Sequence, residues 1–460
     1  AGLRPSFSER VLVVDNGAYT CKVGWAGEKD PKIVAPNATG VLKSQLEPYV
    51  ADQIESSIKN HANLTLTRPC ERGIITNWPC QIDVWQRLFP LAMQPTSPGD
   101  ASSSGGKILS QGVAPKECAL SASVAPCTPT SVVRCMDEVV FEELHFGGFV
   151  RYPSPCGPSW RLAQLRQGGT GGGDVDRGSA CVVVDLGFSA TNVTPCIMGV
   201  PVPRATKRLN IGGKLLTNLL KEVVSYRQYN MMDEFRLING AKEALSYVAP
   251  YGGIAQEMKA TCGGRKRRIP SGIAAYREWV LPDYATTFDG YSRTLPIDES
   301  TGCFRRTRPG DPSVEPALRL ESERFTVPEV LFFPSDIGLK QASLPEVIAE
   351  AVGSCDLLIQ APLYANVILT GGTACLPGLK DRLYRELRPL VPSHMDLKMS
   401  VGSDGEDDPV LMGWRGASDW SSSSPDFAKV VVSREDFNEG GSDYCSNRFN
   451  KFGLSPTVGY

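Results

Sequence analysis

Two stretches of this sequence share one pattern, in which an apolar run reaches an aspartate, a glycine turn follows, and a second apolar run returns. The first covers residues 11–24 (VLVVDNGAYTCKVG) and places Asp15 and Gly17 at the turn. The second covers residues 181–195 (CVVVDLGFSATNVTP) and places Asp185 at the equivalent point. Each pattern is typical of a β-hairpin with buried strands and an acidic residue at its turn.

A single Asp-x-Gly hairpin is explained by an ordinary tight turn. The two copies lie in different halves of the chain, too far apart for a solenoid repeat, and their spacing fits a pair of duplicated domains. The length of 460 residues, 42% of them hydrophobic, is enough for about two to four domains with sizeable cores. Together these features predict two domains that hold one ligand between them.

Composition excludes several classes of protein. The N-terminal stretch AGLRPSFSER lacks the apolar core of a signal peptide, and no run of about 18 apolar residues indicates a membrane-spanning helix. The 14 cysteines are scattered and form no two closely spaced CxxC pairs, which is typical of reduced thiols. The three histidines lie far apart and favour solvated or core positions over a metal or Ser-His-Asp site. The sequence thus predicts a soluble intracellular protein.

The formal net charge of −2 gives the chain as a whole no attraction to nucleic acid or membranes, so any basic patch has to be local. One such patch is the run of four basic residues at 265–268, in a glycine-rich surround. It fits a nuclear-import signal or a patch for an acidic partner, and it also fits a solvated loop.

Helical and irregular segments alternate between the two hairpins. Helices are predicted over residues 46–60, 82–91 and 132–146, and in the second of these the apolar residues recur at helical spacing. Residues 94–130 are rich in Pro, Ser and Gly, and they predict loop or disorder apart from an edge strand within residues 108–124.

The rest of the chain continues this alternation. Residues 151–178 end in GGTGGGDVDRG and predict a surface insertion that forms neither helix nor strand well. Residues 208–226 predict an amphipathic helix opened by a glycine pair, whose backbone N–H groups suit an anion, although glycine is also ordinary punctuation. A helix over 235–248 and a buried strand over 364–370 follow, and the strand leads into GGTACLPG. Strands that alternate with helices predict an α/β fold.

Six segments, in order along the chain, resemble those of the actin superfamily. They are DNGAYTCKVGWAG, GIITNW, VVDLG, KEALSYVA, ERFTVPEVLFFPSDIG and LTGGTACLPGLKDRL. The resemblance covers nearly the whole chain apart from the low-complexity insertions. It implies the actin-like ATPase fold, which has two related α/β domains around a nucleotide cleft, here with low-complexity surface insertions.

The resemblance also implies a division into domains. The expected parts are 1–160 for the first actin-like half with an insertion at about 94–130, 161–180 for a Gly-rich insertion, 181–390 for the second half with loops at about 261–275 and 289–316, and 391–460 for a C-terminal segment that returns to the first half.

Other segments narrow the resemblance. DNGAYTCKVG, RLNIGGKLLTNLLKEVVSYRQ, VLPDY and VVVSREDFNEGG resemble the sixth class of nuclear actin-related proteins more than actin itself. This implies a structural subunit of a nuclear chromatin-remodelling complex that exchanges a histone variant. The implied partners are a remodeller ATPase subunit and a small zinc-finger subunit, with histones met indirectly, and neither membrane binding nor filament formation is expected. The implied location is the nucleus, alone or together with the cytoplasm.

In this superfamily the two hairpins hold the phosphates of a nucleotide from both sides, and aspartates hold Mg²⁺ through water. The resemblance therefore implies ATP or ADP with Mg²⁺ as the cofactor, with Asp15 and Asp185 at the metal and Lys22 at the phosphates. Backbone amides approach phosphate at the hairpin glycines, other residues face the ribose and base, and a glycine turn closes over the nucleoside. The implied nucleotide-binding residues are Asp15, Asn16, Gly17, Lys22, Asp185, Gly187, Thr191, Gly213, Lys242, Glu243, Gly371, Gly372 and Thr373.

The sequence departs from the active ATPases of the superfamily at three positions, so no catalytic residue is assigned. Ser154 stands where a glutamine positions the attacking water, Phe188 where active members have aspartate, and Asn192 where they have histidine. Each loss removes a positioning or electrostatic contribution commonly worth several kcal/mol of barrier. Tyr19 replaces a glycine of the first phosphate loop, where it either crowds the terminal phosphate or lies over the cleft. The resemblance thus implies a nucleotide-holding scaffold that is at best a very slow ATPase.

The main alternative is a cytoskeletal actin-like ATPase that forms or caps filaments. The three departures oppose its chemistry, and residues 36–68 lack the glycine- and methionine-rich loop that actin uses as a subunit contact. A sugar kinase or chaperone ATPase with the same fold is a weaker alternative, because GIITNW and the C-terminal segment match actin.

Overall fold

The computed structural model describes most of the chain. The described residues are 10–43, 47–61, 64–94, 113–167, 180–262, 277–294, 297–298, 303–304, 315–402 and 407–456. The basic run at 265–268 lies outside them, as do residues 95–112 and 168–179 of the two low-complexity segments.

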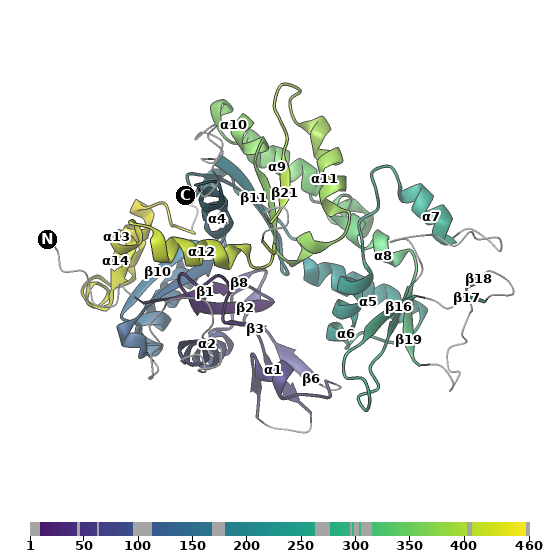
Figure 1. Ribbon diagram of the computed structural model, residues 1–460, viewed down its shortest axis with the longest axis horizontal. Helices are drawn as coiled ribbons and strands as arrows, with labels where there is room; N and C mark the ends of the chain where they lie inside the picture. Colours follow the sequence, from purple (N-terminus) through teal and green to yellow (C-terminus); the bar gives the residue numbers. More distant parts are fainter. Residues whose placement is uncertain are drawn as a thin grey trace.

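Two sheets of similar plan form the centres of the two halves (Figure 1). The first has the order β22-β10-β9-β1-β2-β3, with β1 Val11–Asn16, β2 Thr20–Trp25, β3 Ile33–Pro36, β9 Ala119–Val124, β10 Gly148–Pro153 and β22 Val432–Ser433. The second has the order β13-β12-β11-β20-β21 with β14 beside β12, and its strands are β11 Ala180–Leu186, β12 Thr191–Ile197, β13 Val200–Pro201, β14 Lys207–Leu209, β20 Val367–Thr370 and β21 Met399–Val401. In each sheet an antiparallel hairpin adds a parallel neighbour, β9 beside β1 and β20 beside β11. The predicted α/β fold and both predicted hairpins are confirmed.

Helices cover these sheets and link them. The longer ones are α2 Trp78–Met93, α3 Thr130–Glu138 with a π-helical turn Val139–Glu143, α4 Cys156–Gln167, α5 Gly213–Arg227, α6 Phe235–Leu245, α7 Ile254–Cys262, α9 Leu344–Gly353, α10 Leu357–Tyr364, α11 Leu379–Leu387, α12 Met412–Ser423 and α14 Arg434–Lys451. The shorter ones are α1 Gln53–Ser56, α8 Glu323–Thr326 and α13 Phe427–Val430. The predicted helices near residues 82–91, 132–146, 208–226 and 235–248 are therefore confirmed.

Smaller sheets extend from each half. One flanks the first half and consists of β4 Thr39–Leu42, β5 Tyr49–Val50 and β6 Leu64–Thr67. Another lies at the far end of the second half, with β15 Arg277–Val280, β16 Tyr291–Thr294 and β19 Ala317–Leu320. Two-stranded pairs are formed by β7 Cys70–Glu71 with β8 Ile74–Ile75, and by β17 Ile297–Asp298 with β18 Cys303–Phe304.

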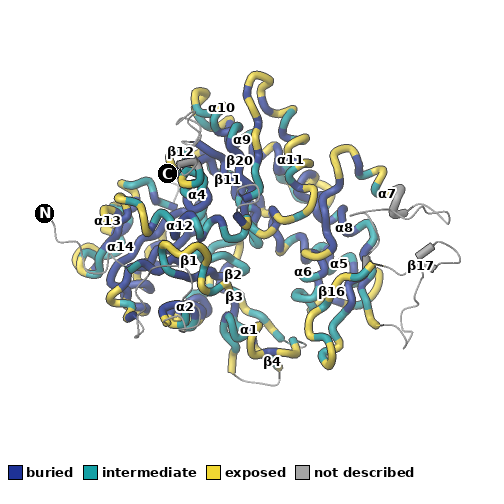
Figure 2. Tube along the Cα trace, in the orientation of Figure 1, coloured by how far each residue is buried: buried dark blue, intermediate teal, exposed yellow. Residues whose placement is uncertain are grey.

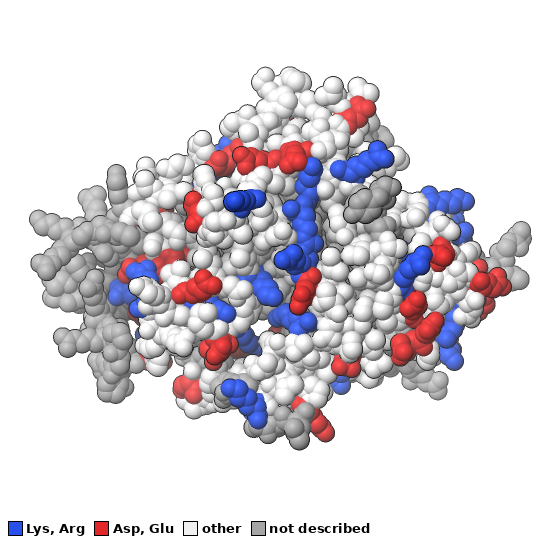
Figure 3. Space-filling model, turned by 180° about the vertical axis from the view of Figure 1, so that it is seen from behind, with Lys and Arg blue, Asp and Glu red and all other residues white. Residues whose placement is uncertain are grey.

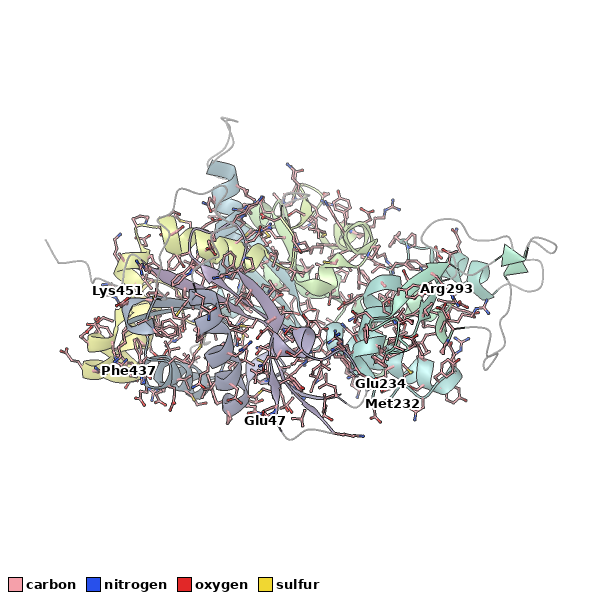
Figure 4. The ribbon with its side chains drawn as sticks, turned by 60° about the horizontal axis from the view of Figure 1, so that its bottom comes forward. Glu47, Met232, Glu234, Arg293, Phe437 and Lys451 are labelled. Atoms are coloured by element: carbon pink, nitrogen blue, oxygen red, sulfur yellow. The ribbon has the colours of Figure 1, made fainter. Side chains whose placement is uncertain are left out.

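The buried residues form two large cores, one in each half, and the outer small sheets are more exposed (Figure 2). The first core combines residues of the N-terminal strands with residues from 414–454, and the second draws on residues 180–399. The C-terminal segment thus packs on the first half. Phe437 of α14 stacks on Phe141 with ring centroids 4.5 Å apart. Phe437 and Lys451 lie at one end of the molecule, and Arg293 of β16 lies at the other (Figure 4).

The strand predicted within residues 108–124 is not an edge strand, and that prediction is wrong. β9 lies between β1 and β10, is parallel to both, and is buried along its whole length. Its small side chains, ALSASV, gave no strong hydrophobic signal. They are tolerated in the interior because their hydroxyls have partners: Ser121 contacts Ser421 at 3.0 Å, and Ser123 donates to Asp15.

The prediction that residues 151–178 form neither helix nor strand well is also wrong for the first part of that segment. Arg151 to Pro153 complete β10, and α4 follows and packs along α12. Glycine makes this approach possible, because a Cβ on Gly416 would lie 1.8 Å from the carbonyl oxygen of Gly157. Trp160 of α4 then stacks on Trp420 of α12 with ring centroids 4.3 Å apart. Glycine and proline therefore mark a close helix contact here rather than a loop.

The helix predicted over residues 46–60 is much shorter than expected. Only the four residues of α1 are helical, and β5 precedes them. Ile54 is the buried residue of α1. A single turn gains little from hydrogen bonding alone, so the small sheet beside it determines its position.

Candidate functional site

A cavity of about 490 Å³ lies between the two halves, at the turns of the two hairpins. Of the thirteen residues implied by the sequence, twelve line it: Asp15, Asn16, Gly17, Lys22, Asp185, Gly187, Gly213, Lys242, Glu243, Gly371, Gly372 and Thr373. The thirteenth, Thr191, is fully buried in β12 and donates from Oγ1 to the Ile211 carbonyl at 2.8 Å. Tyr19, Ser154, Phe188 and Asn192 also line the cavity. The structure thus brings together residues that are far apart in the chain.

The first hairpin carries an ion pair at its turn. Asp15 on β1 faces Lys22 on β2 across the strands, and Lys22 Nζ lies 2.6 Å from Asp15 Oδ2. The other carboxylate oxygen, Oδ1, accepts a hydrogen bond from Ser123 Oγ at 2.8 Å. Because both partners are largely buried, the pair holds both side chains in place at the cavity wall.

The second hairpin repeats the backbone arrangement without the cation. Asp185 faces Asn192 across β11 and β12, and no side-chain partner of Asp185 exists among the described residues. Burial and, to a smaller extent, the nearby Asp15 charge raise the pKa of Asp185 to about 6, with Lys22 acting in the opposite direction. The Oδ1 atom of Asn192 is buried and has no hydrogen-bond partner among the described residues. This wall of the cavity therefore carries an unpaired carboxylate and an unpaired amide oxygen.

At both turns, residues that line the cavity have backbone N–H groups without an acceptor among the described residues. The amides of Ala18 and Tyr19 in the first turn, and of Phe188 and Ser189 in the second, have no hydrogen-bond acceptor among the described residues. All four residues line the cavity. Successive unpaired amides on a tight turn form a concave site that favours an anion.

The hairpin glycines act through the shape of the turns. Gly17 N donates to the Asp15 carbonyl at 3.1 Å, and Gly187 N donates to the Ala190 carbonyl at 3.2 Å. A Cβ on Gly17 would lie 2.7 Å from the Thr20 carbonyl oxygen, so this turn has no room for a side chain. The donors that remain free therefore belong to the residues after each glycine.

The first backbone N–H groups of α5 donate hydrogen bonds to the second hairpin. Gly213 N donates to the Gly187 carbonyl at 3.0 Å, and Lys214 N donates to the Phe188 carbonyl at 2.8 Å. These two N–H groups are therefore unavailable to an anion, and the sequence-based expectation of an anion site at this helix start is wrong for them. Their bonds instead fix the second turn against α5.

Lys242 of α6 lines the cavity, but its ammonium group is turned towards protein acceptors. Lys242 Nζ donates to Asn239 Oδ1 and Thr217 Oγ1, both at 2.9 Å, and to the Gly213 carbonyl at 3.2 Å. Burial lowers the pKa of Lys242 to about 8, against the opposing effect of Glu243. Its donors are engaged, so Lys242 shapes the wall between α5 and α6.

The glycine turn after β20 brings a third segment to the site. Gly371 has φ +90°, and a Cβ there would lie 2.5 Å from the Leu186 carbonyl oxygen. A 3₁₀ turn, Gly372–Cys375, follows, and Thr373 Oγ1 donates to the Gly187 carbonyl at 3.4 Å. Only glycine combines this backbone conformation with so close an approach to β11.

Tyr19 and Phe188 meet across the cavity. Their ring centroids are 4.8 Å apart, and Tyr19 Oη accepts a hydrogen bond from Asn239 Nδ2 at 3.1 Å. The guanidinium of Arg68 lies 4.5 Å from the Tyr19 ring centroid and 5.1 Å from that of Phe188. Sequence reasoning missed the roles of Arg68, Asn239 and Ser123. No motif marks them, and only their contacts in space identify them.

Other kinds of site are not found in the described parts of the chain. There, no helix is long and apolar enough to cross a membrane, and no group of three His, Cys, Asp or Glu residues could hold a metal ion. The twelve cysteines whose side chains are described form no disulfide with one another. On the face opposite that of Figure 1, Lys and Arg side chains form a band down the middle, with acidic side chains scattered around it (Figure 3). Positive charge is thus concentrated locally although the net charge is −2.

Comparison with known proteins identifies the family to which the chain belongs. A family model for actin matches residues 7–450. The actin-like protein arp6 of Aspergillus fumigatus is 33% identical over 468 residues, which cover 97% of this chain and 96% of the relative. The actin-related protein 6 of Arabidopsis thaliana is 33% identical over 455 residues (95% and 99%), and the actin-like protein ARP6 of Yarrowia lipolytica is 33% identical over 438 residues (95% and 97%). The expected actin-like fold is confirmed, and the chain belongs to the actin family.

Proposed function

We propose that this chain is a structural subunit of a nuclear chromatin-remodelling complex that exchanges a histone variant, and that its cleft binds ATP or ADP with Mg²⁺ but hydrolyses ATP slowly or not at all. One observation carries the nucleotide part: free backbone amides from two hairpins and an unpaired carboxylate line one cavity. The amides are suited to phosphate, and the carboxylate is suited to a hydrated divalent cation. The similarity to actin-related proteins of the sixth class supports the nuclear role.

The described side chains fit a metal ion that arrives with the nucleotide. Asp185 has no partner among the described residues, and a pKa of about 6 leaves it mostly ionised at neutral pH. Asp15 lies close enough to raise that pKa, so the two carboxylates face the same region. A bound Mg²⁺ would neutralise charge on the phosphates and on these carboxylates. Asp185 would hold it through water, whereas Asp15 already shares its charge with Lys22.

The same cavity offers little to promote hydrolysis. The side chain of Phe188 has no polar atom, and the amide of Asn192 is unable to take up a proton at neutral pH. Ser154, which follows β10, lines the cavity with a hydroxyl group, which is a weak base. Without a base or a charged group to orient water, bound ATP is expected to persist. Ligand binding would then stabilise the fold by mass action without turnover.

Thermal unfolding and single-turnover kinetics test the nucleotide part. We expect Mg-nucleotide to raise the melting temperature of the protein, and we expect Asp185→Ala to reduce that rise. Asp426→Ala is the matched control, because Asp426 is an exposed aspartate paired with Lys429. If neither bound nucleotide is released on denaturation nor the melting temperature rises with added nucleotide, the binding proposal is wrong. Hydrolysis as fast as that of a polymerising actin would overturn the scaffold role.

Purification of the tagged chain from nuclei tests the complex. The expected companions are a remodeller ATPase subunit and a small zinc-finger subunit, in a fraction that also exchanges histone dimers into nucleosomes. The same purification from cytoplasm serves as the comparison. Recovery with cytoskeletal filaments, in the absence of a remodeller ATPase, would favour the filament-forming alternative and contradict this proposal.

A further inference from the structure

We propose that Tyr19 and Phe188 limit the phosphate chain that the cleft accepts, so that the site binds a nucleoside diphosphate in preference to the triphosphate. This inference rests on the proposed nucleotide binding and specifies its ligand. We call the two side chains the Tyr19–Phe188 ring pair. Tyr19 lies at the turn of the first hairpin and Phe188 at the turn of the second, and both line the cavity.

The ring pair occupies the space between the two turns. Its ring centroids are 4.8 Å apart, which is contact distance for aromatic side chains. The free amides that would hold phosphate belong to these same two residues and to Ala18 and Ser189. A phosphate bound to those amides lies against the rings, and rings in contact leave no gap for a further phosphate between them. The chain of phosphates therefore has to end at this point.

The rings are held in place from several sides. Tyr19 Oη accepts a hydrogen bond from Asn239 Nδ2 of α6, and the Tyr19 carbonyl accepts one from Arg68 Nη1 at 2.9 Å. The Arg68 guanidinium contacts both rings of the pair. Phe188 also packs edge-on against Phe235, with centroids 5.9 Å apart. A terminal phosphate that displaced either ring would break these contacts. The contacts therefore oppose the entry of a third phosphate between the rings.

The charges of the cavity wall give a third phosphate no net attraction. The charged lining residues are the acidic Asp15, Asp185 and Glu243 and the basic Lys22, Arg72 and Lys242, a formal balance of zero. Both lysines already donate to protein acceptors. A third phosphate would meet no unengaged ammonium group on this wall, and the guanidinium of Arg72 is the one lining cation without a side-chain acceptor among the described residues. Arg68 does not compensate, because it lies among the rings and does not line the cavity.

Isothermal titration of the full chain, after removal of any bound nucleotide, tests this inference with Mg-ADP and Mg-ATP as the probes. We expect the wild-type protein to bind ADP at least about tenfold more tightly than ATP. Tyr19→Gly opens the gap from the first half and should bring the two affinities within about threefold of each other, chiefly by tighter ATP binding. Phe188→Ala opens it from the second half and should act in the same direction. The two variants change opposite walls of the cavity. If one of them fails to fold, the other still tests the preference for ADP.

Two control variants distinguish the effect of the aromatic rings on nucleotide affinity from the effect of neighbouring groups. Tyr19→Phe keeps the ring and removes only the hydroxyl bonded to Asn239, so it should keep most of the preference for ADP. Tyr226→Ala removes a tyrosine of α5 that is 93% exposed, and it should change neither affinity. Circular dichroism and melting temperature confirm that each variant is folded.

The outcomes distinguish this inference from the proposal beneath it. Equal affinities of the wild-type protein for ADP and ATP would overturn the ring-pair inference and leave nucleotide binding intact. A preference for ADP that persists in both ring variants would also overturn it. Binding of neither nucleotide by any variant would overturn the nucleotide proposal and the inference with it.

Discussion

The two hairpins at the cavity have the same backbone plan but differ in the residue that faces the aspartate. In the first, Asp15 faces Lys22, and the pair is closed at 2.6 Å. In the second, Asp185 faces Asn192 and has no side-chain partner among the described residues. The residue directly opposite the aspartate therefore decides whether the hairpin carries an ion pair or a carboxylate without a counter-charge.

This difference shows that the repeated hairpin sets the position of each carboxylate. The residue opposite it on the partner strand decides whether that carboxylate has a counter-charge. A buried carboxylate beside an ammonium group stays ionised, because the attraction offsets the loss of hydration. Asp185 lacks that attraction from its own hairpin, and burial raises its pKa to about 6. The first hairpin thus carries an ion pair, and the second carries a carboxylate with a raised pKa and no counter-charge in its own hairpin.

The largest expected effect comes from removing the cation of the first hairpin. Lys22→Met would leave Asp15 buried without its counter-charge, and breaking such a pair costs about 3 kcal/mol of unfolding free energy. Chemical denaturation followed by circular dichroism measures it. Lys429→Met is the control, because Lys429 is 62% exposed in its pair with Asp426, and its loss should cost less than about 0.5 kcal/mol. Equal losses in the two variants would show that the first hairpin gains nothing from its ion pair.

A smaller effect, of opposite sign, is expected at the second hairpin. The folded-state pKa of Asp185 lies above its ordinary value of 3.8, so its contribution to stability is complete below about pH 4 and is lost as the pH rises through about 6. Asp185→Asn removes the penalty for the ionised form. In metal-free buffer the variant should therefore gain on the order of 2 kcal/mol over the wild-type protein at pH 7, and nothing near pH 4.

Asp15→Asn sharpens this comparison. It leaves Lys22 without its carboxylate, so it should destabilise the protein at pH 7, where Asp185→Asn stabilises it. Melting temperatures of both variants between pH 4 and pH 8 give the answer. If both substitutions shift the melting temperature in the same direction at neutral pH, the two hairpins do not differ in the way their contacts indicate.

The smallest expected effect concerns Thr191, the predicted site residue that the structure places away from the cavity. Thr191→Val removes the hydroxyl bonded to the Ile211 carbonyl, and one such buried bond is worth about 1 kcal/mol. Nucleotide affinity should stay unchanged. Thr65→Val is the control, since Thr65 is exposed on β6. A large loss of nucleotide affinity in Thr191→Val would instead place this residue in the site.

Much of the fold could be predicted, because alternating and helical apolar patterns are local. Both hairpins and the helices α2, α5 and α6 follow from such patterns. β9 and α4 could not be predicted, since their sequences are rich in small residues, Gly and Pro. Their burial depends on neighbours that are distant in the chain, such as α12 against α4.

The candidate site shows the same limit. Asp15 and Asp185 could be singled out because each ends an apolar strand before a glycine turn. The contacts of Tyr19 with Phe188, Arg68 and Asn239 could not, because they join four segments that no spacing rule connects. Nor could the sequence reveal that the donors of Lys242 are engaged within the protein.

The sequence by itself determined the α/β plan, the paired acidic hairpins and the presence of Phe188 and Asn192 in the second hairpin. Those features are encoded in residue type and short-range periodicity. Only the tertiary structure decided which carboxylate is paired, which amides are free and that two aromatic rings close the gap between the turns. Charge, hydrogen bonding and steric exclusion all depend on distances of a few ångström, and folding sets those distances between residues that the chain keeps far apart.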